Sequence, residues 1–526
     1  MSTATEPAAG GPQNVSAQGT VVAGMTLISR ISGFARDMVM SHFFGAGAQA
    51  DAFFVAFRIP NFFRRLFAEG AFNQAFVPVL ARYKDQQREQ FLEFIAAVSG
   101  NLAVAVWSVV LLGVVFSPAL VTVFAPGFWN APEQFAMATA MLQITFPYLG
   151  FISLTAFAAS LLNSHHRYAV PAFTPVLLNI SLIAAMLFTT DVFSEPVYAL
   201  AWGVFVAGLA QFALQLPALG RLGLLVRPRL SLAHPGVRQV GRLLLPAVFA
   251  ASVSQINTLI DTILASTLMT GSISWLYYAD RLMELPVGLV AVTLGTVLLP
   301  NLSRLASAND SDGFAATLEW GLRMGLLLGL PSAAALYALA LPLVATLFQH
   351  GAMTVADARM AALALEAFAV GLLPLVLVKV AAPAYFARED TATPFRFAVI
   401  AVLTNIALNL ALFSWMGHVG LALATSAAAW VNALLLLRGI GGAAAKPAHR
   451  YRPTRALWLT AGRSSLTAGI MAALLWWWLP PATAWLDAGL WDRAWWLTTA
   501  VAAGIGGYAL GVMALGERPR MLLHRA

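Results

Sequence analysis

Long apolar stretches, broken by glycine, proline and charged residues, recur along the whole chain. A helix needs about 20 mostly apolar residues to cross roughly 30 Å of hydrocarbon, and stretches of that length predict about fourteen membrane-spanning helices. Their centres are expected near residues 33, 66, 105, 150, 179, 208, 255, 288, 332, 368, 405, 428, 468 and 505. The pattern therefore predicts an all-α, polytopic integral membrane protein.

Composition supports this interpretation and removes several others. Of the 526 residues, 60% are hydrophobic and 10% are charged, and the mean hydropathy of +0.76 is far above that of a soluble domain. A membrane barrel would keep every second residue of a strand polar, which the long Ala, Leu and Val runs do not allow. Because the chain has no cysteine, disulfides, thiolate metal sites and thiol nucleophiles are excluded.

Basic residues gather in every second predicted connection, notably within 82–88, 165–167, 221–242 and 438–455. By the positive-inside rule, these connections and both termini are cytoplasmic. The net charge of +8 is explained by such loops, so we infer no nucleic-acid partner. Residues 1–20 contain no lysine or arginine, so we expect no cleavable signal peptide. The seven tryptophans from Trp476 to Trp496 are expected at the outer interface.

The chain also contains an internal repeat. Rarer residues recur after 222 to 226 positions, among them Asp37 with Asp261 and Asn179 with Asn405. Chance matches in an Ala/Leu/Gly-rich chain are the alternative explanation. An even number of predicted spans separates the copies, so a duplication predicts two six-helix lobes related by a pseudo-two-fold axis along the membrane normal, plus two C-terminal helices.

These features predict the following division of the chain. We expect a polar cytoplasmic tail at 1–20, an N-lobe at 21–220, a basic cytoplasmic linker at 221–239, a C-lobe at 240–438, a second basic linker at 439–456, two further helices at 457–516 and a cytoplasmic tail at 517–526.

Eight of the 31 basic residues fall inside predicted spans. An arginine at the bilayer centre costs about 2.5 to 3.5 kcal/mol, so these side chains are not all expected to face lipid. Snorkelling to the head-groups fits Arg58 tolerably. Two ion pairs between residues four positions apart are also predicted, Arg65 with Glu69 and Glu319 with Arg323. The eight residues are Arg30, Arg36, Arg58, Arg64, Arg65, Arg281, Arg323 and Lys379.

The polar residues of the first, second and eighth predicted spans share one face of each helix. Arg30, Arg36 and Asp37, for example, lie within about 120° around the first span. Wet faces from both lobes predict a central, water-filled cavity. Its surplus charge is positive and nearly all arginine, and the guanidinium fork matches phosphate oxygens. The predicted cargo is therefore anionic and phosphorylated.

Several motifs are similar to those of one known family. They are SRISGFARD at 29–37, FGAG at 44–47, ADAFFVAFRIPN at 50–61, RRLFAEGAFNQAFVP at 64–78, PAFTP at 171–175, YYADRLME at 277–284 and LGTVLLP at 294–300. These motifs resemble the MurJ (MviN) family of lipid II flippases over the first twelve predicted spans. The resemblance implies a fold of the multidrug/oligosaccharidyl-lipid/polysaccharide (MOP) exporter superfamily, with the helices at 457–516 forming a groove for a lipid tail.

The resemblance also implies a function and roles for individual residues. It implies alternating-access transport of an undecaprenyl-pyrophosphate-linked peptidoglycan precursor, lipid II, from the inner to the outer leaflet of the cytoplasmic membrane, with no enzymatic step. The implied substrate-binding residues are Arg30, Arg36, Arg64, Arg281, Asn61 and Ser29. The implied gating or polar cavity residues are Asp37, Asp51, Glu284, Gly33 and Ser274.

Energy coupling is expected without a cofactor. None of the three lysines follows a glycine, so the chain has no phosphate-binding loop for ATP, and the membrane potential is the expected driving force. Some family members hold a sodium ion, and Asp261 stands where an acidic ligand would be. We hypothesise that the ammonium of Lys379 pairs with Asp261 and replaces that ion. The alternative is that the two groups are unrelated.

Expected partners are lipid II and membrane lipids, and the expected state is a monomer, with contacts to cell-wall synthesis proteins left open. Two other functions are considered. Another exporter of lipid-linked oligosaccharide or polysaccharide would share the two lobes but not the dense arginine set. A membrane glycosyltransferase would need paired carboxylates on an outer loop, and Asp191 and Asp357 are isolated.

Overall fold

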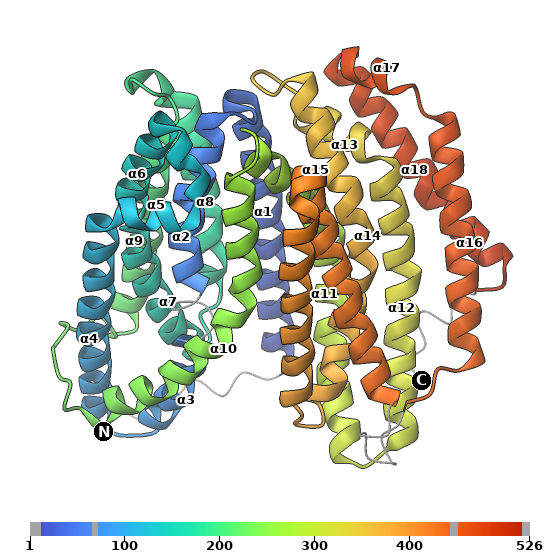
Figure 1. Cartoon of the computed structure of the whole chain (residues 1–526). Helices are drawn as coiled ribbons and strands as arrows, with labels where there is room; N and C mark the ends of the chain where they lie inside the picture. The colour runs from blue at the N-terminus through green and yellow to red at the C-terminus, as the bar shows by residue number, and fades with distance from the viewer. Residues whose placement is uncertain (1–11, 66–71, 442–450, 518–526) are drawn as a thin grey trace. The chain divides into compact units, whose positions relative to one another are not determined.

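A computed structural model describes residues 12–65, 72–441 and 451–517, and every element in these ranges is helical (Figure 1). The all-α prediction is therefore confirmed. Some predicted segments lie outside the described residues: most of the two tails (1–11 and 518–526), part of the second basic linker (442–450) and Glu69.

The chain divides into two compact units. Unit 1 comprises residues 1–43 and 48–256, and unit 2 comprises residues 44–47 and 257–526. The division falls inside one continuous helix, α10 (Pro235–Ser266), rather than in the segment 221–239 where we expected a linker. Helix α1 begins at Pro12, inside the predicted polar tail.

Unit 1 contains the first nine α-helices and most of α10. They are α1 (Pro12–Phe44), α2 (Ala48–Arg64), α3 (Phe72–Lys84), α4 (Arg88–Val115), α5 (Ser117–Phe124), α6 (Pro132–Thr145), α7 (Tyr148–Ser164), α8 (Ala169–Phe188) and α9 (Tyr198–Arg221), with short 3₁₀ turns at Pro126–Asn130 and Thr190–Val192.

An aromatic core lies where α3, α4 and α7 meet. Phe76 and Phe94 are fully buried there and stack at 5.9 Å, and Phe157 packs on Phe76 at 5.2 Å. The ring of Tyr83 stacks on Phe94 at 4.2 Å. Aromatic side chains bury more area than any others, so this core holds α3 and α7 in place and thereby fixes the walls of the cavity described below.

Unit 2 contains the remaining helices. They are α11 (Ser272–Ser307), α12 (Ser311–Ala338), α13 (Ala340–Leu347), α14 (Val355–Phe386), α15 (Ala392–Gly441), α16 (Arg455–Trp478), α17 (Ala482–Asp487) and α18 (Leu490–Ala514). Helix α14 is central and packs against α11, α12 and α15. Gly417, with φ 55° and ψ −132°, breaks α15, because this conformation favours glycine. The predicted spans centred at 405 and 428 lie on either side of it.

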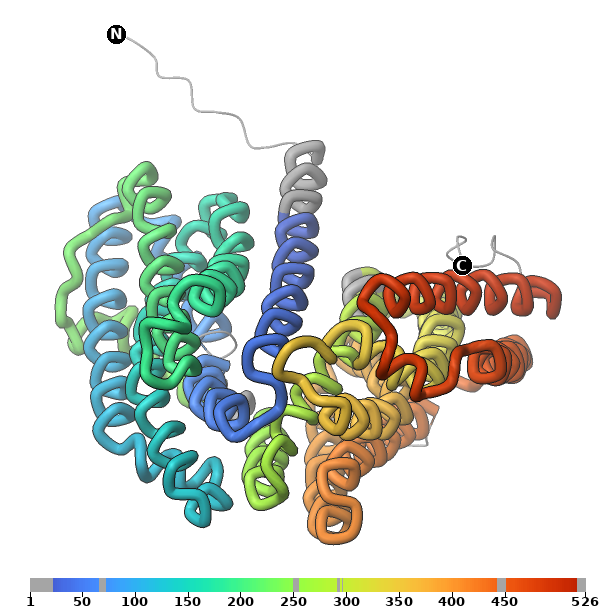
Figure 2. Tube along the Cα trace, turned by 90° about the horizontal axis from the view of Figure 1, so that it is seen from above, coloured from blue at the N-terminus to red at the C-terminus, as the bar shows by residue number. Residues whose placement is uncertain are grey.

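The two C-terminal long helices pack on the outside of unit 2. Helix α16 runs along α12, and α18 runs beside α16, as Figures 1 and 2 show. Leu339, Met471, Leu475 and Ala500 form a small buried cluster between these elements. Of the seven C-terminal tryptophans, Trp485 is 1% exposed and packs on Trp496. The exposed ones are Trp476, Trp477, Trp478, Trp491 and Trp495.

Eight helices of the described chain are long and apolar enough to cross a membrane. They are the segments Arg88–Val115, Pro132–Ser164, Ala169–Phe188, Tyr198–Arg221, Ser311–Ala338, Val355–Phe386, Ala392–Gly441 and Leu490–Ala514. One of them, Ala392–Gly441, holds two of the predicted spans. The multi-pass architecture is evident, and the total of fourteen spans stays a prediction.

Candidate functional site

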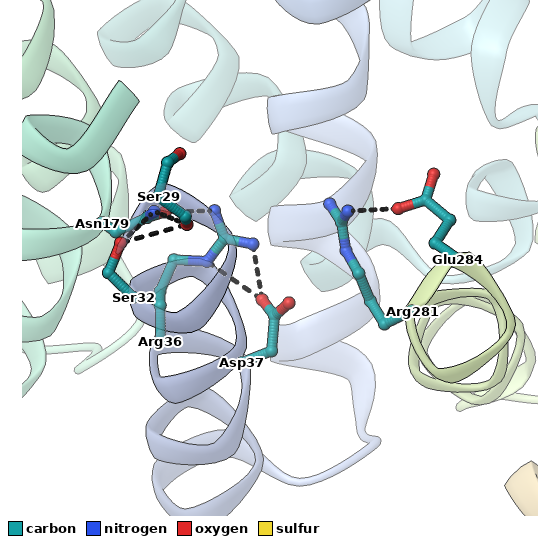
Figure 3. Close-up of polar contacts among 7 residues, drawn as sticks. All are labelled: Ser29, Ser32, Arg36, Asp37, Asn179, Arg281 and Glu284. Carbon is teal, nitrogen blue, oxygen red and sulfur yellow. Dashed lines mark hydrogen bonds and ion pairs between the residues drawn. The ribbon is translucent and has the colours of Figure 1, made fainter. Parts of the chain in front are cut away.

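A buried ion pair lies on α1 and contacts α8 (Figure 3). Arg36 and Asp37 are 7% and 1% exposed. The Arg36 guanidinium donates to the Asp37 carboxylate from Nε at 2.9 Å and from Nη2 at 2.6 Å. Its Nη1 donates to Oδ1 of Asn179 at 3.1 Å. Arg36 therefore differs from the cavity-facing cation we expected, since Asp37 neutralises it and it links α1 to α8.

The same asparagine explains why Ser29 and Gly33 stand where they do. Asn179 Nδ2 donates to the carbonyl of Ser29 at 3.1 Å and to Oγ of Ser32 at 2.9 Å. A Cβ added at Gly33 would lie 3.4 Å from this nitrogen, at the edge of ordinary contact. Ser29 thus contributes its backbone carbonyl, and Gly33 contributes the absence of a side chain, to the contact between α1 and α8.

The last turn of α2 carries Asn61 and Arg64. Pro60 has no N–H, which leaves the carbonyl of Ala56 without its helical partner, and Oγ1 of Thr145 donates to that carbonyl at 3.1 Å. Beyond the proline, Arg64 Nε donates to Oδ1 of Asn61 at 2.9 Å. The two predicted substrate-binding residues of this helix are therefore brought together, with the asparagine orienting the guanidinium.

Arg64 lies at the wall of a cavity of about 700 Å³ within unit 1. We call it the polar cavity, because just over half of its lining residues carry hydroxyl or amide side chains, although carbon atoms form most of its surface. Its described polar lining residues are Arg64, Asn73, Tyr148, Thr155, Ser160, Asn163, Ser164, Tyr168, Thr174 and Gln211. Arg64 is the one charged side chain among the described lining residues, so the cavity suits a ligand with a single anionic end.

A second arginine site lies on α11 in unit 2 (Figure 3). Arg281 Nη1 donates to Oε2 of Glu284 at 2.9 Å, one helical turn away. The guanidinium also lies over the ring of Tyr277, with Cζ 4.9 Å from its centroid. The side chains of Arg281 and Glu284 are 34% and 50% exposed. The Arg281 pair is accessible, whereas the Arg36 pair is buried. Arg281 is therefore a better candidate than Arg36 for binding an anion.

The repeat predicted from sequence has a structural counterpart around Asp261. Asn409 Nδ2 donates to Asp261 Oδ1 at 2.7 Å and to Asn405 Oδ1 at 2.9 Å, and Asn405 Nδ2 donates to Thr425 at 3.3 Å. In each unit, one intervening side chain therefore links the aspartate to the repeated asparagine: Arg36 between Asp37 and Asn179, and Asn409 between Asp261 and Asn405. In unit 1 the link is a guanidinium, whereas Ile260 stands next to Asp261 in unit 2.

The structure does not bring Lys379 and Asp261 together. The side chain of Lys379 is exposed on α14, while Asp261 accepts its hydrogen bond from Asn409. Within the described residues Lys379 makes no ion pair with Asp261. The charge-substitution hypothesis therefore has no support, because a lysine near the end of a span reaches the interface rather than the interior.

The other predicted residues occupy varied surroundings. Arg30 is exposed on α1 and Arg65 is exposed at the end of α2. Asp51 is 2% exposed in the first turn of α2. Ser274 is fully buried in the first turn of α11. These two buried residues stand at helix starts, where polar groups satisfy backbone donors, and their predicted gating roles stay predictions.

The predicted pair of Glu319 with Arg323 is wrong. Arg323 instead pairs with Glu517 at 2.9 Å and donates to Thr460 at 3.0 Å. Arg463 reaches the same glutamate at 3.4 Å. Glu517 is the first residue of the predicted C-terminal tail, and its carboxylate is 4% exposed. A buried carboxylate needs cationic partners more than an exposed one does.

Glu319 instead contacts the segment that directly precedes α16. It accepts hydrogen bonds from the hydroxyl of Tyr451 at 3.2 Å and from Thr454. Burial, reinforced by the neighbouring carboxylate, raises the pKa of Tyr451. The two acids of this region thus anchor the segment that begins at Tyr451, together with α16, against α12.

An apolar cavity of about 560 Å³ lies between α12, α16 and α18 in unit 2. Its walls include Leu327, Leu336 and Met471, and Glu517 is its one acidic lining residue among those described. We call it the apolar cavity. Because an apolar lining offers few hydrogen bonds, this space suits a hydrocarbon chain and not a polar group.

Sequence reasoning missed two residues of these sites and one further candidate on α14. Asn179 and Asn405 were noted only as markers of the repeat, although asparagines recurring inside apolar spans signal buried hydrogen bonding. Glu366, half-buried in the middle of α14, was overlooked. A carboxylate within a span is a functional candidate by default.

Comparisons with known proteins agree with this architecture. A model of the family described as "Lipid II flippase MurJ" matches residues 40–489. The chain is 45% identical to a "Probable lipid II flippase MurJ" of Vibrio cholerae, over 95% of this chain and 96% of the relative. It is 42% identical to a "Probable lipid II flippase MurJ" of Haemophilus influenzae, over 95% and 99%.

Solved structures give the same result. One described as "Lipid II flippase MurJ, inward closed conformation" superimposes with a TM-score of 0.79 and 27% identity, over 96% of this chain and 100% of that one. An inward-facing MATE multidrug transporter of the MOP superfamily has a TM-score of 0.63 at 13% identity, over 79% and 95%. The latter likeness concerns the fold alone.

Proposed function

The chain belongs to the MurJ family of lipid II flippases, and on that premise we propose that it moves lipid II from the inner to the outer leaflet of the cytoplasmic membrane. It is a multi-pass transporter and not an enzyme. Lipid II is the undecaprenyl-pyrophosphate-linked precursor of peptidoglycan, so the proposed cargo has an anionic head and a long apolar tail.

The observation that carries the proposal is the setting of Arg64. This guanidinium, oriented by Asn61, borders the polar cavity, whose described lining residues include no carboxylate. A guanidinium binds phosphate oxygens two at a time. We infer that Arg64 in one lobe and Arg281 in the other each bind the pyrophosphate during transport.

The apolar cavity supports a place for the tail of the cargo. Helices α16 and α18 form it with α12, as the expected lipid-tail groove at 457–516 requires. Isoprenoid carbon gains no hydrogen bonds in membrane lipid or in this cavity, so the groove would guide the tail at little energetic cost. Glu517, the acidic residue of its lining, pairs with Arg323 and therefore presents no free charge to the tail.

Alternating access is supported by the turn between α1 and α2. Residues 44–47 group with unit 2, and the hydroxyl of Tyr278 donates to the carbonyl of Gly45 at 3.0 Å. A Cβ added at Gly45 would lie 2.4 Å from the carbonyl oxygen of Ala352. We infer that this turn contacts Tyr278 and Ala352 in one transport state and loses these contacts in the other.

Energy coupling is proposed to come from the membrane potential, worth about 2.3 kcal/mol per charge per 100 mV if the anionic head crosses uncompensated. A sodium ion at Asp261 is the second candidate, and Asn405, Asn409 and Thr425 would supply further oxygens. Varying sodium at constant ionic strength and potential separates the two, because only the second predicts a response. We further propose cytoplasmic termini and a monomer that contacts cell-wall synthesis proteins.

The proposal is tested by reconstitution. Purified protein in vesicles that carry labelled lipid II in one leaflet should transfer the label to the other leaflet, measured by its accessibility to a membrane-impermeant reagent. Arg64→Ala and Arg281→Ala should each lower the rate about 10- to 100-fold, since a charge-assisted contact is lost. Arg304→Ala removes an exposed arginine from the end of α11 and serves as the matched control.

Transfer at the rate of protein-free vesicles would overturn the proposed function. Normal transfer by both variants, with Arg304→Ala unchanged, would leave transport in place but contradict the role of the arginines.

A further inference from the structure

The polar cavity contains far more uncharged hydrogen-bonding groups than a phosphate needs. Thr155, Ser160 and Thr174 are 3%, 6% and 6% exposed, yet they line a space of about 700 Å³. Small-molecule sites in proteins occupy about 300 to 1,000 Å³. The cavity is large enough to hold a group well beyond the phosphate at Arg64.

Two amides point to a ligand in this cavity. Gln211 is 1% exposed, and its Nε2 donates to the carbonyl of Thr174 at 2.9 Å. Its Oε1 is buried with no hydrogen-bond partner within the described residues, a costly arrangement for a polar atom. Asn163, at the end of α7, is exposed and lines the same cavity. Side-chain amides both donate and accept hydrogen bonds.

We propose that the polar cavity is the subsite for the sugar part of the cargo, an inference that rests on the proposed function. Sugar hydroxyls and acetamido groups both donate and accept, which suits side-chain amides that do both and lining hydroxyls that can accept while they donate to carbonyls of their own helices. Arg64 then binds the adjoining phosphate at the edge of the same space. A peptide stem carries carboxylates and would call for more cations, and a lipid tail would leave the hydroxyl and amide groups of the lining without partners.

The arrangement also explains why five helices contribute to one cavity. Arg64 comes from α2, Asn73 from α3, Thr155 and Asn163 from α7, Thr174 from α8, and Gln211 from α9. Oγ of Ser160 donates to Oδ1 of Asn73 at 2.7 Å, which fixes α3 against α7. The subsite therefore sits on rigid, packed elements, which positions a ligand more accurately than loops do.

The test uses the full-length protein in detergent and two soluble probes. One is a short-chain prenyl pyrophosphate, and the other is the same molecule bearing an N-acetylated disaccharide. The wild type should bind the sugar-bearing probe about tenfold more tightly. Thr155→Val combined with Asn163→Ala should bring the two affinities together, while the affinity for the bare pyrophosphate stays unchanged.

The control is Thr122→Val, because Thr122, like Thr155, donates to the carbonyl four residues earlier but lies outside the cavity. If the double variant fails to fold, Asn163→Ala alone, at an exposed position, should still reduce the difference. Equal affinity of the wild type for both probes would overturn the sugar subsite. Failure of the bare pyrophosphate to bind the wild type would instead count against the proposed function.

Discussion

The Arg36 pair allows the structural role of an intramembrane arginine to be separated from a role in binding cargo. Arg36→Met keeps most of the side-chain volume and removes the guanidinium that donates twice to Asp37. Because Asp37 is 1% exposed, its carboxylate stays buried without that cation. Breaking one side of a buried pair costs about 3 to 5 kcal/mol.

A second substitution should reverse this loss. In Arg36→Met with Asp37→Leu both charges of this pair are removed, and replacing both partners of a buried pair with apolar groups is often neutral or stabilising by about 1 to 4 kcal/mol. Asn179 loses one donor but still donates to Ser29 and Ser32. The thermodynamic cycle should therefore show a coupling of several kcal/mol.

The assay is thermal unfolding of the purified protein, followed in parallel with lipid II transfer. For a unit of this size about 2 to 4 °C corresponds to 1 kcal/mol, so Arg36→Met should lower Tm by on the order of 10 °C, and the double variant should recover most of it. A single variant with wild-type Tm and no transfer would refute the reasoning. Arg36 would then be a cargo-binding cation, as the sequence alone predicted.

Three further substitutions test other parts of the account. Arg323→Met leaves Glu517 with Arg463 at 3.4 Å as its remaining ion-pair partner within the described chain. The Tm should therefore fall by several degrees, and protease should cleave near α16 sooner. Wild-type Tm and wild-type cleavage would contradict the anchoring role of the pair. Gly45→Ala places a Cβ against the carbonyl of Ala352 at a residue with φ +57°. It should destabilise the contact of this turn with Ala352 by at least about 1 to 3 kcal/mol and should slow transfer. Gly47→Ala, with open space around it, is the control, and equal transfer by both variants would count against a role for this contact. Lys379→Ala removes an exposed side chain and should transfer lipid II at the wild-type rate, so that a clear loss would revive its role near Asp261.

The helical architecture was predictable because the bilayer fixes the length of a spanning helix. The predicted centres at 405 and 428 illustrate this, since the structure has one element there, broken at Gly417. The repeat was also visible in the sequence, because Asn179 and Asn405 each connect to the aspartate of their repeat through one other side chain.

The partners of the charged residues were the least predictable feature. Arg323 pairs with a glutamate 194 positions away, which no local rule could select over Glu319. Arg36 pairs with its immediate neighbour, although adjacent residues point to different sides of a helix. In both cases burial decides the partner, and burial depends on how distant helices pack. The intramembrane arginines thus divide into buried links, such as Arg36, and accessible side chains, such as Arg281, only once the structure is known.

The central claim is that guanidinium groups recognise the pyrophosphate of the cargo. The most direct measurement compares transfer of lipid II with transfer of a lipid bearing the same sugars and peptide but no phosphate, in vesicles containing the wild type or Arg64→Ala. The account predicts that the wild type strongly prefers the pyrophosphate-linked lipid and that Arg64→Ala loses this preference. Equal transfer of the two lipids by the wild type would contradict it.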